Sequence, residues 1–161
     1  TLVPFFNTHR MVQEYYENFY SKAHYYGEIL KSEGKTADIA NWRKRIVENW
    51  PRVSITDNTP PIDKMVLVGQ NVKFKACVTL GNLKPEEIVV QLQLGLRSLG
   101  GSFECARDFT MLNTGKDGDV YLYEIDVQPD SSGRQDYALR ILPFNKDIPH
   151  PFTPVRVAWE A

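Results

Sequence analysis

The spacing of the hydrophobic residues changes once along the chain. Over the first 50 residues, apolar side chains recur every three or four positions, as on one face of an α-helix. After Pro51 the spacing becomes two, which is typical of strands that bury one face. This change predicts a helical segment over residues 1–51 and a β-domain over residues 52–161.

The first helix is predicted over residues 8–32. Thr8 has a hydroxyl that can cap the first turn, and Gly34 is a suitable stop. The apolar positions of this segment fall on one stripe: Val12, Tyr15, Tyr16, Phe19, Ala23, Tyr26 and Leu30.

The second helix is predicted over residues 36–49. Thr36 is its expected N-cap, Asp38 suits the dipole in the first turn, and Pro51 ends it. Its apolar stripe comprises Ile39, Trp42, Ile46, Val47 and Trp50. Because only a short SEGK segment joins the two helices, we expect them to form an antiparallel pair.

The β-domain contains two clear alternating strands, residues 72–80 and residues 88–94. Turn signals separate these strands from others, and no helical pattern lies between them. The further strands are predicted at residues 52–56, 65–69, 107–113, 120–127, 137–142 and 153–160. This pattern is typical of an immunoglobulin-like antiparallel β-sandwich, so the fold class expected for the chain is α+β.

Tyr137 follows a turn and begins a strand, which leaves two interpretations open. In one, its hydroxyl bonds back to the upstream turn, as the conserved tyrosine does at a sandwich corner. In the other, it is a half-buried strand residue.

The charge balance of the chain excludes some classes of partner. The net charge is −1, with 19 basic and 20 acidic residues, so we expect no nucleic-acid binding. The cluster from Arg43 to Arg45 is interpreted as the solvated face of a helix. No apolar run reaches the roughly 20 residues that a membrane span needs. The chain begins without a methionine, which predicts a piece of a longer protein or a processed one.

The two cysteines, Cys77 and Cys105, are too few for a disulfide framework. Cys77 is predicted on the outward face of a strand, and Cys105 lies near the start of another. We interpret both as free thiols of a cytoplasmic protein.

The sequence nominates no catalytic, cofactor-binding or metal-binding residue. Residues 113–124 resemble a calcium loop in their glycine and final glutamate, but Gly115 replaces a ligand and the next segment alternates as a strand, so we expect a hairpin. His9, His24 and His150 show no ligand spacing.

Two neighbouring carboxylates, Glu86 and Glu87, fall in a predicted turn. We interpret both as solvated, because turn residues usually lie at the surface.

Aromatic residues crowd the helical segment, and two interpretations of them are weighed. They are expected to form a packing surface between helices and other elements, and less readily a platform on which sugars stack. In the β-domain, Tyr121, Tyr123 and Trp159 are candidates for glucan stacking, although they fit the core or an edge better. The helical set comprises Tyr15, Tyr16, Phe19, Tyr20, Tyr25, Tyr26, Trp42 and Trp50.

The segment NTHRMVQEYYENFY, residues 7–20, resembles the end of the catalytic region in bacterial and archaeal α-glucan phosphorylases. Four later segments are similar to the C-terminal extension of the same family. They are WPRV at 50–53, VTLGNLKPEEIVV at 78–90, GRQDYALRILP at 133–143, and the two motifs HPF and VAW within 150–159. The matched residues of the first segment are Thr8, Arg10, Met11, Val12, Glu14, Tyr15, Phe19 and Tyr20.

The resemblance implies a glycosyltransferase of carbohydrate metabolism. Such enzymes move glucosyl units between α-1,4-glucan and orthophosphate, with pyridoxal phosphate held on a lysine. Their catalytic motifs lie upstream of the closing helix and do not occur in this chain. The resemblance therefore implies a non-catalytic C-terminal accessory region, whose partners are the catalytic domains of the same polypeptide, an α-glucan or a second copy.

Three functional interpretations follow. The first is structural packing against the catalytic domains, and it predicts an apolar helix surface that the chain itself leaves uncovered. The second is a carbohydrate-binding module, and it predicts coplanar exposed aromatics on one sheet face. The third is an independent immunoglobulin-like interaction domain, and it predicts that residues 52–161 fold alone.

Overall fold

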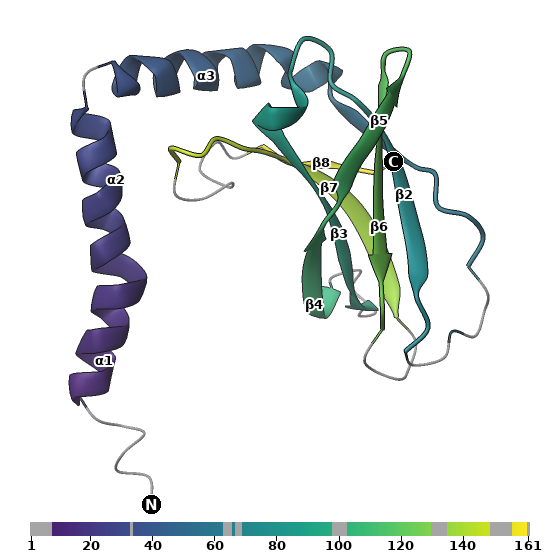
Figure 1. Cartoon of the computed structure of the whole chain (residues 1–161), viewed down its shortest axis with the longest axis horizontal. Helices are drawn as coiled ribbons and strands as arrows, with labels where there is room; N and C mark the ends of the chain where they lie inside the picture. Colours follow the sequence, from purple (N-terminus) through teal and green to yellow (C-terminus); the bar gives the residue numbers. More distant parts are fainter. Residues whose placement is uncertain are drawn as a thin grey trace, which may run out of the picture.

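A computed structural model of the chain has the α+β architecture, with two helices followed by two antiparallel sheets (Figure 1). The structure describes residues 8–32, 34–62, 66, 69–97, 103–129, 135–148 and 156–160. The N-terminal helix stands beside the sheets, while the second helix lies across one end of them.

The N-terminal helix is continuous, which confirms the prediction for residues 8–32. It consists of α1 (Thr8–Tyr15), a π-helical turn (Tyr16–Tyr20) and α2 (Ser21–Lys31). The π turn was not predicted. The Ser21 N–H donates to the Tyr16 carbonyl, and its hydroxyl donates to the Glu17 carbonyl at 2.9 Å.

The second helix is α3 (Lys35–Asn49), followed by a short 3₁₀ turn (Trp50–Arg52). It begins one residue before Thr36, so the prediction of Thr36 as its N-cap is wrong. The Thr36 hydroxyl instead donates to the Leu30 carbonyl at 2.7 Å and satisfies an end group of α2. Gly34, the predicted stop, lies between the helices with a left-handed φ of 82°.

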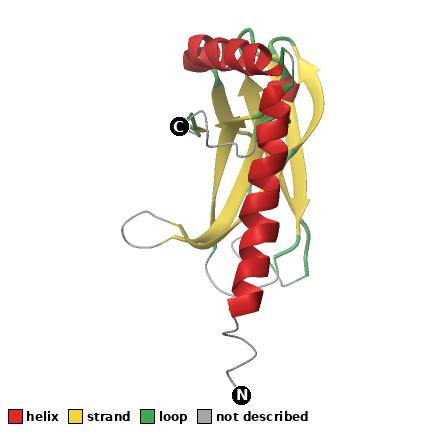
Figure 2. Ribbon diagram, turned by 90° about the vertical axis from the view of Figure 1, so that its left-hand side faces the viewer, coloured by secondary structure: helices red, strands yellow, loops and turns green. Residues whose placement is uncertain are grey.

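The prediction of an antiparallel helical pair is also wrong. Two views at right angles show the N-terminal helix and α3 meeting at a wide angle (Figures 1 and 2). The physical reason is that Trp42 and Ile46 on α3, together with Trp50 just after it, belong to the core of the sheets. This apolar face is therefore not available to the first helix. Val47, which was assigned to the same stripe, is exposed.

Within the described residues, eight strands form two four-stranded sheets in which all neighbours are antiparallel. The first sheet has the order β1 (Ser54–Asp57), β2 (Val72–Thr79), β6 (Val120–Val127) and β5 (Leu112–Asp117). The second sheet has the order β4 (Phe103–Thr110), β3 (Ile88–Arg97), β7 (Asp136–Pro143) and β8 (Ala158–Trp159). The strand predicted at 65–69 lies mostly outside the described residues, as does the first part of the strand predicted at 153–160.

The single strand predicted over residues 107–113 is wrong, because the chain changes sheets there. β4 ends at Thr110 in the second sheet and β5 begins at Leu112 in the first. The residue between them, Met111, is buried, and its N–H donates to the Val90 carbonyl at 2.9 Å. The hydrophobic pattern runs on through this corner, and so it does not reveal the crossing.

The segment weighed as a calcium loop is the β5–β6 hairpin, as expected. Asp117 pairs with Val120 across the turn, and Gly118 adopts a left-handed φ of 57°. Strands, not helices, therefore flank this segment.

The core lies between the two sheets and confirms the alternation predicted for β2 and β3. The inward positions of both strands are buried, whereas their neighbours are partly exposed. The buried set comprises Phe74, Ala76 and Val78 on β2, and Ile88, Val90, Leu92 and Leu94 on β3. An edge-to-face contact between Phe74 and Tyr137, with ring centroids 5.0 Å apart, joins the two sheets.

Candidate interaction surface

The N-terminal helix presents a row of exposed apolar side chains. Their exposed fractions run from 48% at Leu30 to 66% at Tyr20. No residue from Thr8 to Tyr20 is buried. The exposed set comprises Met11, Val12, Tyr15, Tyr16, Phe19, Tyr20, Tyr25 and Leu30. The residues that the structure describes thus leave this face uncovered, as the packing interpretation predicted.

Contiguous exposed apolar surface in folded proteins is typical of interaction sites. The rings within the face already touch one another, with the Tyr15 and Phe19 centroids 5.5 Å apart. The π turn lies at Tyr16–Tyr20, in the middle of the face, and such turns are frequent at functional sites. The aromatic residues of the helical segment thus divide into two groups: Trp42 and Trp50 are core residues, whereas the rings of the first helix are exposed, apart from the partly buried Tyr26.

The elbow between the two helices is held by polar contacts near Gly34. Lys35 Nζ lies 2.7 Å from the Asp147 carboxylate, which connects the start of α3 to the segment after β7. The hydrogen bond to Asp147 raises the pKa of Lys35. Together with the bond from Thr36 to Leu30, this pair fixes where the first helix leaves α3.

The other end of α3 is anchored by a salt bridge between Arg45 and Glu87. Glu87 is 8% exposed, and its second oxygen accepts the Lys84 N–H at 3.0 Å. The interpretation of Glu87 as solvated is therefore wrong: its carboxylate caps its own turn and receives the guanidinium of α3. Arg43 and Lys44 are exposed, as expected of a solvated helix face.

The three aromatic residues proposed for glucan stacking are not brought together. Tyr123 is buried, and Tyr121 packs against the core from the same strand. Trp159 lies on β8 in the other sheet and is 48% exposed. Of these three, Trp159 is the exposed residue, whereas Tyr121 is partly buried.

A polar network connects strands of the second sheet beside Trp159. The Arg140 guanidinium donates to Gln91 Oε1 at 2.8 Å and to Asp108 Oδ2 at 2.6 Å. Gln93 donates to the other Asp108 oxygen at 3.1 Å. The Arg140 guanidinium carbon also lies 5.6 Å from the Trp159 ring centroid.

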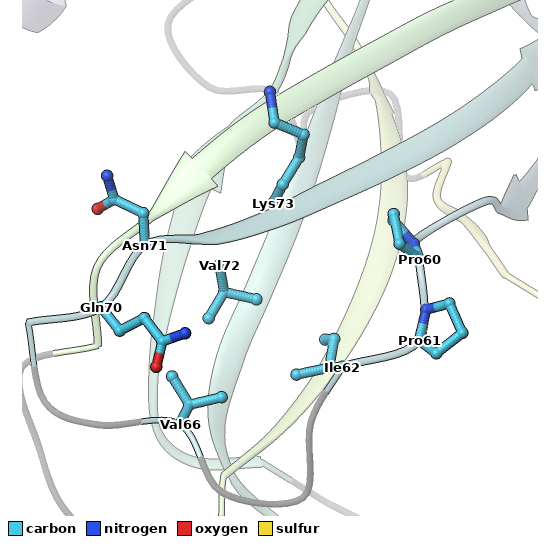
Figure 3. Close-up of a pocket in the computed structure, with 8 residues that line it drawn as sticks. All are labelled: Pro60, Pro61, Ile62, Val66, Gln70, Asn71, Val72 and Lys73. Atoms are coloured by element: carbon cyan, nitrogen blue, oxygen red, sulfur yellow. The ribbon is translucent and has the colours of Figure 1, made fainter.

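A small pocket lies between the loop at Pro60 and the start of β2 (Figure 3). Its volume is about 170 Å³, and Pro60 and Ile62 line it together with Gln70, Asn71 and Lys73. Lys73 Nζ lies 3.3 Å from the Asp126 carboxylate, whose hydrogen bond raises the pKa of the lysine.

The residues of this pocket do not fit pyridoxal phosphate. Lys73, the lysine that lines the pocket, is ion-paired with both Asp126 and Glu124 and is not held as a neutral amine. The lining also offers no helix N-terminus to hold a phosphate. No step of cofactor chemistry is therefore assigned to this pocket.

The remaining sequence candidates are dispersed. His9 and His24 lie on the first helix, and His150 lies outside the described residues. Among the residues described, no cluster of three or more His, Cys, Asp or Glu side chains has the arrangement of a metal site. Cys77 is a free, half-buried thiol on β2. The structure does not describe the side chain of Cys105. None of the helices described combines the length and apolar character needed to cross a bilayer.

Comparisons with known proteins agree with the sequence motifs. The family model for the glycogen phosphorylase C-terminal domain matches residues 50–161. Over 99% of its length the chain is 26% identical to the maltodextrin phosphorylase of Thermococcus litoralis, of which it spans 19%. Over 89% of its length it is 29% identical to the glycogen phosphorylases of Mycobacterium tuberculosis and Mycobacterium bovis, of which it spans 17%. The chain thus spans less than a fifth of these relatives, and it belongs to the glycogen phosphorylase C-terminal domain family.

Proposed function

We propose that the chain is the non-catalytic C-terminal accessory region of an α-glucan phosphorylase, and that its main role is structural packing. In this proposal, the exposed face of the N-terminal helix docks onto the catalytic domains of the same polypeptide. The family model begins at residue 50, whereas the similarity to the Thermococcus relative covers 99% of the chain. This difference supports assigning the first helix to the region that precedes the C-terminal domain in the relatives.

The single observation that carries the proposal is the uncovered aromatic face of the helix. Eight large apolar side chains remain about half exposed or more. Complete burial of one such side chain is worth about 1.5–3 kcal/mol, so docking of the whole face would contribute on the order of 10 kcal/mol before ordering costs. A monomeric domain gains nothing from this surface unless another domain covers it.

The activity of the whole polypeptide belongs to the same proposal. The relatives are named as maltodextrin and glycogen phosphorylases, so we assign to the parent protein glucosyl transfer between α-1,4-glucan and orthophosphate. Pyridoxal phosphate would be bound by its other domains, since the pocket at Lys73 does not fit it. The free thiol of Cys77 supports a cytoplasmic location.

The β-domain is assigned to the immunoglobulin-like sandwiches on the basis of strand order. The order β1-β2-β6-β5 corresponds to strands A, B, E and D of that fold, and β3-β7-β8 corresponds to C, F and G. Strand β4 is then an additional edge strand beside β3.

The domain division between residues 51 and 52 is better placed at the elbow near Gly34. Trp42 and Ile46 on α3 share one core with both sheets, so a segment that begins at residue 52 would expose that core. This arrangement favours the packing role over an independent domain limited to residues 52–161.

The proposal is tested in the full-length polypeptide with the double variant Phe19→Gln and Tyr20→Gln. Glutamine keeps helix propensity but removes the apolar rings. We expect a lower thermal midpoint for the catalytic domains and a loss of phosphorylase activity at temperatures that the wild type tolerates. The matched control, Leu112→Gln, alters a side chain that is 69% exposed on β5 and should leave both unchanged. Equal stability of the double variant and the wild type would overturn the docking role.

A further inference from the structure

Trp159 is unlike the other two tryptophans of the chain. Trp42 and Trp50 are core residues with exposed fractions of 5% and 9%, whereas Trp159 is 48% exposed. It pairs with Arg140 across β7 and β8. Its ring is thus held against a guanidinium and presents the rest of its surface to solvent.

A row of side chains extends from Trp159 across the second sheet. The register places Trp159 beside Arg140, Arg140 beside Gln91, and Gln91 beside Thr110, so that the row crosses all four strands. The inward neighbour of Gln91 on β3, Leu92, is in the core, so this row lies on the outer face. Three strand spacings span about 14 Å, which matches the length of a short oligosaccharide.

The polar groups in this row, and in the neighbouring pair of Gln93 and Asp108, are fixed before any ligand arrives. Arg140 is 7% exposed and bonds both Gln91 and Asp108, and Gln93 bonds the second oxygen of Asp108. A carboxylate offers about four lone-pair sites, and each glutamine amide carries two N–H donors. The bonds to Asp108 and the glutamines therefore leave acceptor and donor capacity toward solvent.

The charges on this face determine which ligand it suits. The Arg140 guanidinium is paired with the Asp108 carboxylate, so the site does not offer the unpaired cation that binds phosphate groups. What remains is a flat indole beside neutral amides, a carboxylate and the Thr110 hydroxyl. A sugar ring has an apolar C–H face and a rim of hydroxyls that both donate and accept, and these features complement the indole and the polar groups respectively.

We propose that this face of the second sheet is a binding site for a neutral oligosaccharide, with Trp159 as the stacking surface and Asp108, Gln91 and Gln93 as hydroxyl partners. Arg140 is a positioning residue, because it holds Gln91, Asp108 and the indole in place. The choice of an α-1,4-glucan as the sugar rests on the proposed function. The site lies on the sheet and is separate from the helix face that docks.

The test is a titration of the chain with maltoheptaose, followed by tryptophan fluorescence and amide chemical shifts. Since Trp159 is the exposed tryptophan, a saturable fluorescence change reports on this residue. We expect shifts confined to Trp159 and to the residues around Gln91 and Gln93. A wild-type chain that shows no saturable change at millimolar maltoheptaose would overturn the proposal.

Variants separate stacking from a general effect on the fold. Trp159→Ala should weaken binding at least tenfold, whereas Phe144→Ala removes another exposed ring, 43% exposed, and should leave the affinity unchanged. Equal affinity of Trp159→Ala and wild type, with both folded by circular dichroism, would overturn the site. The helix variant Phe19→Gln with Tyr20→Gln should bind the sugar as the wild type does, so a failure of helix docking and a failure of sugar binding are distinguishable.

Discussion

The phenol oxygen of Tyr137 on β7 lies 2.5 Å from a carboxylate oxygen of Asp57 on β1, and this hydrogen bond joins the two sheets. Tyr137 is half-buried, as the second of its two interpretations expected, and most of the turn upstream of it lies outside the described residues. The same ring contacts Phe74 edge to face. One side chain thus combines a polar and an apolar contact between the layers.

Tyr137→Phe should lower the free energy of unfolding by about 1–2 kcal/mol, since it removes a partly exposed hydrogen bond to a charged group while keeping the ring. Urea unfolding at pH 7 measures this difference. Phe74→Leu offers a comparison, because it perturbs the ring contact and leaves the hydroxyl bonded. Unchanged stability of Tyr137→Phe would show that the bond to Asp57 contributes nothing.

The same bond predicts a dependence of stability on pH. Burial first, and then the hydrogen bond to Asp57, raises the pKa of Tyr137 from 10.0 to about 12. The folded state therefore favours the neutral phenol. This contribution is complete below pH 10 and is lost as the pH rises from 10 to 12. An ultraviolet titration of the wild type minus Tyr137→Phe should show one tyrosine ionising near pH 12, and a difference curve centred at pH 10 would contradict the assignment.

The bridge between Arg45 and Glu87 should be worth more than a surface ion pair. Arg45→Ala leaves a nearly buried carboxylate with only the Lys84 N–H, so we expect a loss of about 1–2 kcal/mol, less than for a fully buried pair because Arg45 is half exposed. Lys44→Ala breaks an exposed pair with Glu48 and should cost less than about 0.5 kcal/mol. Chemical denaturation of both variants measures the difference, and equal effects would show that the anchor has no special role.

Ile46 tests whether α3 belongs to the β-domain. Its side chain is completely buried, so Ile46→Ala should cost about 2–4 kcal/mol through lost burial and the cavity left behind. Val47→Ala, on the exposed side of the same helix, should cost less than about 0.5 kcal/mol. The unfolding of α3, followed by the exchange of its amides in increasing urea, should coincide with that of the amides of β2 and β3. A separate early transition for α3 would place the boundary at residue 52 after all.

The isolated chain should self-associate through the N-terminal helix, because the apolar face has no cover within the described residues. Sedimentation velocity should show a concentration-dependent dimer or larger species. Phe19→Gln with Tyr20→Gln should restore the monomer, whereas Leu112→Gln should not. A wild-type chain that stays monomeric at all concentrations would mean that the face is better solvated than its composition indicates.

The strands β2 and β3 were predictable because the side chains along each strand alternate between the core and the solvated outer face. Phe74 and Val90, for example, face the core. The passage of the chain from one sheet to the other at Met111 was not predictable, since a change of sheet leaves the alternation of apolar and polar residues intact. The helix boundaries followed from Pro51 and Gly34, but the angle between the helices depends on which face the sheets cover. The sheets and the first helix compete for the same apolar face of α3, and the outcome depends on tertiary packing.

The candidate surfaces were only partly visible in the sequence. The family motif around Tyr15 and Phe19 resembles the end of the catalytic region and so predicted that this helix packs against other domains, although its periodicity alone equally predicted packing within the chain. The burial of Glu87 had no local signal, because its partner Arg45 lies on another element. The burial of Arg140 did have a local signal, because a single charged residue within an apolar strand needs polar partners. Its bonds hold the polar groups of the face around Trp159 in place.

Hydrogen–deuterium exchange of the N-terminal helix tests the central claim most directly. The amides of Tyr15 to Tyr20 would be compared in the isolated chain, at a concentration where it is monomeric, and in the full-length polypeptide. Docking onto the catalytic domains predicts that these amides exchange at least a hundredfold more slowly in the full-length protein, while the core amides of β3 change little. Equal exchange of the helix in both proteins would show that its apolar face remains uncovered and would contradict the packing role.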